Sequence, residues 1–148
     1  MASTPAPVPA ADHADHARPV AKTALAVLVA AVTCAIAVSA IAAIAHAAGA
    51  RHDFKPLTPS AYLPLTTIGV LAGGIGWQIV RRRAAQPTTM LRRLVPAVVL
   101  VSLIPDVAVG VSGGQPGTTW GAVAALMCMH VAVAAVAVAV FRRVMPPN

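Results

Sequence analysis

Four long apolar segments, separated by short polar stretches, dominate this sequence. They run over about residues 23–48, 60–80, 94–112 and 119–141, and Asp106 is the only Asp, Glu, Lys or Arg inside them. A helix rises about 1.5 Å per residue, so about 20 residues cross the hydrocarbon core of a bilayer. Only 10% of the residues are charged, far fewer than in a soluble domain. The sequence therefore predicts an all-α membrane protein, a bundle of four transmembrane helices.

These segments use most of the 148 residues, so no separate soluble domain is expected. Residues 1–22 are rich in proline and alanine and lack aromatic residues, which predicts a disordered cytoplasmic tail. The first apolar segment is too long, and begins too far into the chain, for a cleaved signal peptide, so we expect it to be retained. The prediction is one transmembrane domain over residues 23–143, followed by a short cytoplasmic C-terminus of residues 144–148.

Lysine and arginine are unevenly distributed over the connections. The loop after the first segment carries two of the eleven and the loop before the fourth carries none, so the tail, the middle loop and the C-terminus hold the rest. Basic residues favour the cytoplasmic side, so both termini are expected in the cytoplasm and the protein in the cytoplasmic membrane. The net charge of +7 then reflects topology and attraction to anionic lipid rather than nucleic-acid binding. The middle loop carries Arg81, Arg82, Arg83, Arg92 and Arg93.

Small residues and one interior proline predict how the helices pack. Gly69, Gly73 and Gly76 recur along the second segment, a spacing typical of helices that approach each other closely in lipid. Small-residue faces on the first and second segments also favour association with a second copy or with another membrane protein. Pro105 lies inside the third segment and is expected to kink it, because proline removes a helical hydrogen bond.

The carboxylate of Asp106, directly after Pro105, is the strongest functional signal. A charge within the bilayer costs about 2.5–3.5 kcal/mol on insertion scales, so it needs a partner or a proton. The third and fourth segments are joined by a short loop and should be antiparallel neighbours, which brings His130 within reach. The candidate intramembrane polar site therefore comprises Asp106, His130, Thr66, Thr67 and Ser102.

Three interpretations of Asp106 stay open. It holds the bundle together through a hydrogen bond; or it exchanges a proton for a cationic substrate, with His130 tuning it; or it is near enough to the outer surface to be hydrated and has no special role. The first predicts a non-enzymatic accessory or structural membrane protein. The second predicts a small proton-coupled transporter acting as an oligomer, with Asp106 as the proton carrier.

Catalytic and metal sites are not expected. The sequence has no paired carboxylates, no nucleophile beside a base and no glycine-rich phosphate loop, so we predict no enzyme activity, no catalytic residue and no cofactor. A metal site formed by His46, Asp106 and His130 would need three segments to converge, although His46 lies near the membrane surface. The expected partners are the lipid bilayer and a second copy or another membrane protein.

Three motifs carry a resemblance to a known family. They are Leu57-Thr-Pro-Ser-Ala-Tyr-Leu-Pro64 with the glycine-rich helix after it, Ser102-Leu-Ile-Pro-Asp106, and Ala125-Leu-Met-Cys-Met-His130. In these motifs, over a little more than half its length, the chain resembles an uncharacterised family of small four-helix membrane proteins of high-GC Gram-positive bacteria, classed as a domain of unknown function. The resemblance implies an inner-membrane location and supplies no activity.

Overall fold

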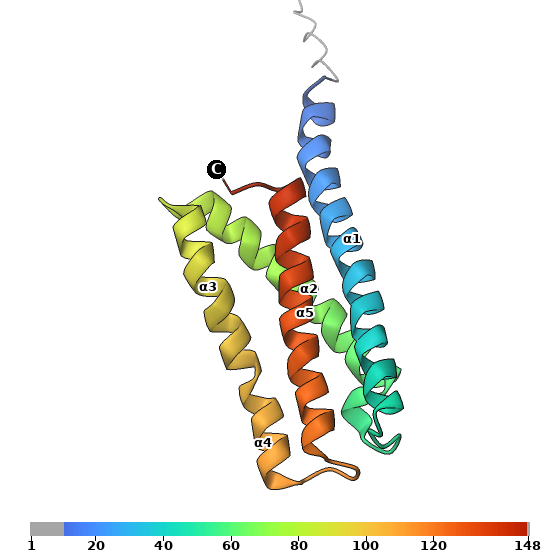
Figure 1. The fold of residues 1–148 in the computed structure, drawn as a ribbon. Helices are drawn as coiled ribbons and strands as arrows, with labels where there is room; N and C mark the ends of the chain where they lie inside the picture. Colours follow the sequence, from blue (N-terminus) through green and yellow to red (C-terminus); the bar gives the residue numbers. More distant parts are fainter. Residues whose placement is uncertain (1–10, 148) are drawn as a thin grey trace, which may run out of the picture.

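The computed structural model describes residues 11–147, which form helices joined by short connections. In chain order these are α1 (Ala11–Ala47), the single 3-10 turn η1 (Lys55–Leu57), α2 (Pro59–Arg83), α3 (Pro87–Ser102), α4 (Ile104–Ser112) and α5 (Trp120–Val144). Figure 1 shows that α3 and α4 run end to end as one span. Within the described residues, four stretches are long and apolar enough to cross a membrane: Ala21–Ala47, Pro59–Arg83, Pro87–Ser112 and Trp120–Val144. This part of the fold prediction is confirmed.

The helix ends differ from the predicted segments. α1 begins at Ala11, so its helix includes residues 11–22 of the predicted tail, while residues 1–10 lie outside the described part of the chain. Alanine is the best helix former, and the alanines of this stretch allow α1 to continue beyond its apolar part. α3 begins at Pro87, ahead of Arg92 and Arg93, because proline suits the first turn of a helix and long arginine side chains can reach out of the bilayer.

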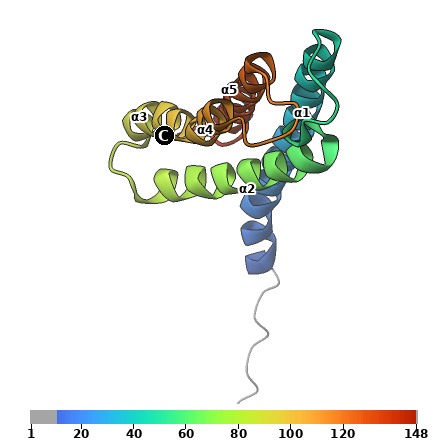
Figure 2. The ribbon, with the colours of Figure 1, turned by 90° about the horizontal axis from the view of Figure 1, so that it is seen from below.

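The helices form a layer with one helix laid across it. α5 lies in the middle of the layer, between α1 on one side and α3 with α4 on the other, as Figure 2 shows from one end. α2 crosses one face of this layer at a steep inclination and contacts α1, α5 and α3. Because a steeply crossing helix contacts its neighbours over short lengths, space remains between α2 and the layer.

The tightest helix pair is α1 with α5, and small side chains make it possible. The face of α1 that is buried carries Ala26, Ala30, Cys34 and Ala42, spaced so that they lie above one another. Small residues let two backbones approach, which is the main source of helix association in lipid. These small residues of α1 therefore pack inside the chain.

The outer surface of the bundle is apolar. Large hydrophobic side chains are strongly exposed on every span, for example Ile36 on α1 at 67%, Leu65 on α2 at 68% and Leu100 on α3 at 67%. A monomeric soluble protein rarely exposes so large an apolar surface. This surface suits the hydrocarbon core of a bilayer.

The basic residues gather at one end of the bundle. The start of α1, the α2–α3 connection and the C-terminus all lie at that end in Figure 1. The loops at residues 48–58 and 113–119 lie at the opposite end. The uneven distribution of lysine and arginine in the sequence thus corresponds to two different ends of the folded molecule.

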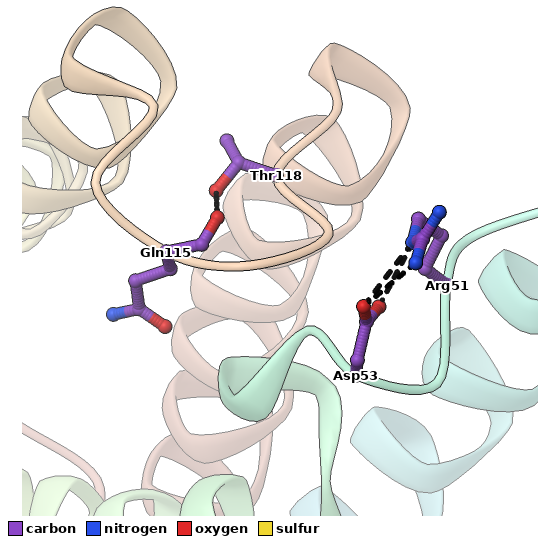
Figure 3. Close-up of polar contacts among 4 residues, drawn as sticks. All are labelled: Arg51, Asp53, Gln115 and Thr118. Carbon is purple, nitrogen blue, oxygen red and sulfur yellow. Dashed lines mark hydrogen bonds and ion pairs between the residues drawn. The ribbon is translucent and has the colours of Figure 1, made fainter.

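At the less basic end, two loops pack against each other. Arg51 donates hydrogen bonds to the carboxylate of Asp53, with an ion-pair distance of 2.9 Å, and the second loop, with Gln115 and Thr118, lies beside this pair (Figure 3). The hydrogen bond from Arg51 lowers the pKa of the Asp53 carboxyl group. Gly117 in the second loop has a left-handed φ of +74°, and a Cβ atom there would collide with the Asp53 carboxylate.

Gly117→Ala is therefore expected to destabilise the folded protein by more than the roughly 1–2 kcal/mol that a left-handed backbone costs a residue with a Cβ atom. Gly113→Ala is the matched control, because Gly113 also has a positive φ, +57°, but open space around it. Unfolding of detergent-solubilised protein by SDS, followed by circular dichroism, measures both changes. An equal loss of stability in the two variants would show that the contact between the loops does not stabilise the folded protein.

Candidate functional site

A cleft of about 650 Å³ lies between α2, α3, α4 and α5. It follows from the steep crossing of α2, which leaves α2 separated from the layer along part of its length. Most of the residues that line it are apolar. On α2 and α3 they include Leu65, Gly69, Gly73, Leu94 and Val98, and on α5 they include Leu126, Val133, Ala137 and Phe141.

Asp106 and His130 meet at the wall of this cleft. The side chain of Asp106 is only 10% exposed, and its Oδ2 atom lies 2.9 Å from Nδ1 of His130. The same Nδ1 atom lies 3.0 Å from the carbonyl oxygen of Leu126. Because a carbonyl oxygen can only accept, Nδ1 must carry a hydrogen. In this geometry the ring hydrogen points to the Leu126 carbonyl, and the Asp106 carboxylate lies beside the imidazole.

The Oδ2 atom of Asp106 has no hydrogen-bond partner within residues 11–147, although it is fully buried. A buried carboxylate oxygen without a donor is costly, and most such atoms in proteins are satisfied. Asp106 therefore has an unused capacity to accept a hydrogen bond or to pair with a positive charge.

A break in the third span positions Asp106. Pro105 has no N–H to offer to the carbonyl of Val101, and the helix is interrupted at Leu103 between α3 and α4. Asp106 consequently lies in the first turn of α4, where the free N–H groups of a helix favour a negative charge. One turn later, Gly110 allows α4 to approach α5: a Cβ atom at Gly110 would lie 2.9 Å from the ring of Trp120.

The other predicted polar residues divide into two groups. Thr66 is buried and Ser102 is half-buried, and both line the cleft that contains Asp106 and His130. The hydroxyl of Ser102 donates to the carbonyl of Val99 at 2.7 Å. Thr67 is exposed on another face of α2, where it donates to the carbonyl of Leu63 at 2.9 Å. The structure therefore brings Asp106, His130, Thr66 and Ser102 to one cleft and leaves Thr67 outside it.

The glycines of α2 require a correction. Gly69, Gly73 and Gly76 were predicted to pack against another helix, but they form an open wall of the cleft, and an added Cβ atom at Gly69 or Gly76 would meet nothing within 4 Å. The close contact uses Gly74 instead, where a Cβ atom would lie 2.9 Å from Val27 of α1 and 3.5 Å from Phe141 of α5. The pattern of glycines alone does not reveal which side of α2 faces the neighbouring helices.

Two aromatic side chains in the cleft wall are tied to other elements. The Tyr62 hydroxyl donates to Ser39 of α1 at 3.3 Å, and the indole nitrogen of Trp77 donates to the carbonyl of Met145 at 2.9 Å. These bonds hold the two ends of α2 against α1 and the C-terminal segment. The sequence showed both residues only as aromatic residues at the ends of a span.

His46 does not join the pair. It lies at the end of α1, with Nδ1 3.1 Å from the carbonyl of Ala50 and its ring stacked on His52 at 4.4 Å between centroids. The described part of the chain contains no group of three histidine, cysteine or acidic side chains that could hold a metal ion. The structure therefore keeps His46 apart from Asp106 and His130.

These features define a helical protein with four helical stretches long and apolar enough to span a membrane, and with a buried carboxylate beside a half-buried histidine in a lateral cleft. The chain belongs to the family of unknown function DUF6069, whose model matches residues 15–146. No curated protein and no solved structure gives a significant match.

Proposed function

We propose that this protein is a non-enzymatic accessory protein of the cytoplasmic membrane, which binds a partner molecule from the bilayer in the cleft between α2, α3, α4 and α5. The single observation that supports this proposal is the open side of the cleft that Gly69, Gly73 and Gly76 of α2 form. It leaves a volume within the range of about 300–1,000 Å³ that is typical of ligand sites. The apolar lining suits a partner that is dissolved in the membrane.

The chemistry of the lining supports a binding role rather than catalysis. The Ser102 hydroxyl is hydrogen-bonded to its own helix, so it is not activated by His130. His130 directs its Nδ1 hydrogen to a backbone carbonyl of α5. Neither arrangement assembles a nucleophile with a base.

Native mass spectrometry of the protein, released from its membrane in mild detergent, tests this proposal. We expect the wild-type protein to retain a bound non-protein species and Gly69→Leu to lose it, because leucine at this open position projects into the cleft. Ala135→Leu is the control, since Ala135 is exposed on α5 outside the cleft. A wild-type protein without any bound species, or a species that both variants retain, would overturn the proposal.

The proposed orientation places both termini in the cytoplasm, since the basic residues gather at that end of the bundle. A fluorescent protein fused after residue 147 is expected to fold and fluoresce, whereas alkaline phosphatase fused there stays inactive. Fusions after Gly114, in the opposite loop, should give the reverse result. The same result at both sites would refute the orientation.

A proton-coupled transporter, acting as an oligomer with Asp106 as the proton carrier, is the second candidate. The contact between Asp106 and His130 inside the cleft favours it, because such pairs serve as proton relays in membrane proteins. In proteoliposomes, a proton gradient should then drive the flux of a cationic solute, and Asp106→Asn should abolish that flux. Flux that is unchanged in this variant would exclude the transporter.

A further inference from the structure

Few titratable side chains face the cleft. Of the described residues that line it, the titratable ones are Asp106, His130 and Tyr62. The Tyr62 hydroxyl is engaged with Ser39, and the Nδ1 hydrogen of His130 is engaged with Leu126. The buried Oδ2 atom of Asp106 alone lacks a hydrogen-bond partner within residues 11–147. The charge that faces the cleft is therefore the carboxylate of Asp106, whose side chain is 10% exposed and which is negative when ionised.

The volume of the cleft matches a small ligand better than a helix of another protein. A transmembrane helix about 10 Å across and 30 Å long occupies roughly 2,400 Å³. The cleft holds about 650 Å³. A small amphiphilic molecule fits this volume, whereas a whole helix does not.

We propose that the cleft binds a lipophilic cation, an organic ammonium or phosphonium whose charged centre lies against Asp106 and whose apolar substituents fill the space between α2 and α3. This inference rests on the proposed function and names the chemical class of the partner. The cation places a positive charge beside the Asp106 carboxylate, whose polar neighbour in the wall of the cleft is the imidazole of His130.

The first test measures binding of radiolabelled tetraphenylphosphonium to the full-length protein in phosphatidylcholine nanodiscs, with empty nanodiscs as background. Saturable binding is expected, and Asp106→Asn should weaken it at least about tenfold, because a buried charge pair is lost. Asp53→Asn is the control, since Asp53 lies in the loop outside the cleft and pairs with Arg51. Tetraphenylborate, which has the same shape and the opposite charge, should not compete.

Binding that is no greater than to empty nanodiscs, equal binding to Asp106→Asn, or competition by tetraphenylborate would each overturn this inference. Such a failure differs from failure of the proposed function. A bound species that disappears in Gly69→Leu, but without any binding of tetraphenylphosphonium, would leave the binding role intact and show that the partner is not a lipophilic cation.

A second test does not depend on the Asp106 variant. In His130→Leu, tetraphenylphosphonium should raise the SDS concentration needed for unfolding more than it does in the wild-type protein, because the ligand replaces the missing imidazole. Gly69→Leu combined with His130→Leu should lose this effect. An equal shift in His130→Leu with and without Gly69→Leu would place the cation outside the cleft and overturn the inference.

Discussion

His130→Leu is expected to destabilise the folded bundle by about 1–3 kcal/mol, the cost of leaving a buried polar group without its partner. His130 is the basic group beside the buried Oδ2 atom of Asp106, at 2.9 Å. Without it, the carboxylate must stay charged in an apolar wall or take up a proton, and proton uptake limits the loss. Unfolding in mixed micelles of SDS and a mild detergent measures the change.

The matched control is the double variant Asp106→Leu with His130→Leu. Replacing a whole buried pair with apolar residues is often neutral or stabilising, so we expect the double variant to unfold near the wild-type SDS concentration or above it. The difference between the single and double variants isolates the interaction of the two side chains. If His130→Leu alone unfolds like the wild-type protein, the pair does not stabilise the bundle.

Gly74→Leu is expected to disrupt the packing of α2 against α1 and α5, with a loss of about 3 kcal/mol or more. Gly74 is buried where the three helices meet, and even a single Cβ atom there would lie 2.9 Å from Val27. The larger leucine side chain therefore requires the helices to separate. Far-UV circular dichroism during SDS titration, together with the elution volume of the protein in detergent, reports this change.

Gly69→Leu is the control on the same helix, because its position opens onto the cleft. It should keep the stability of the wild-type protein within about 0.5 kcal/mol, as for a substitution away from packed contacts. If Gly69→Leu destabilises as much as Gly74→Leu, then α2 packs through the face that the glycine spacing suggested.

Of the five residues of the predicted polar site, the structure brings four to one cleft and leaves Thr67 outside it. Asp106 and His130 could be paired from sequence because a short loop joins their spans and their depths differ by about one helical turn. Thr66 and Thr67 could not be distinguished, since adjacent residues on a helix point about 100° apart and either could face the bundle. The interruption at Leu103 followed from Pro105, whose chemistry is local.

The sequence by itself determined the number of spans, their approximate ends and the uneven placement of basic residues, because hydropathy and charge are properties of each segment alone. Only the tertiary structure decided that α2 crosses the layer steeply, that Gly74 rather than Gly69 packs, and that a cleft opens beside Asp106. The physical reason is that lipid is as apolar as a protein interior. In a membrane helix the packed face and the lipid face carry similar side chains, so the hydrophobic pattern does not show which face is buried.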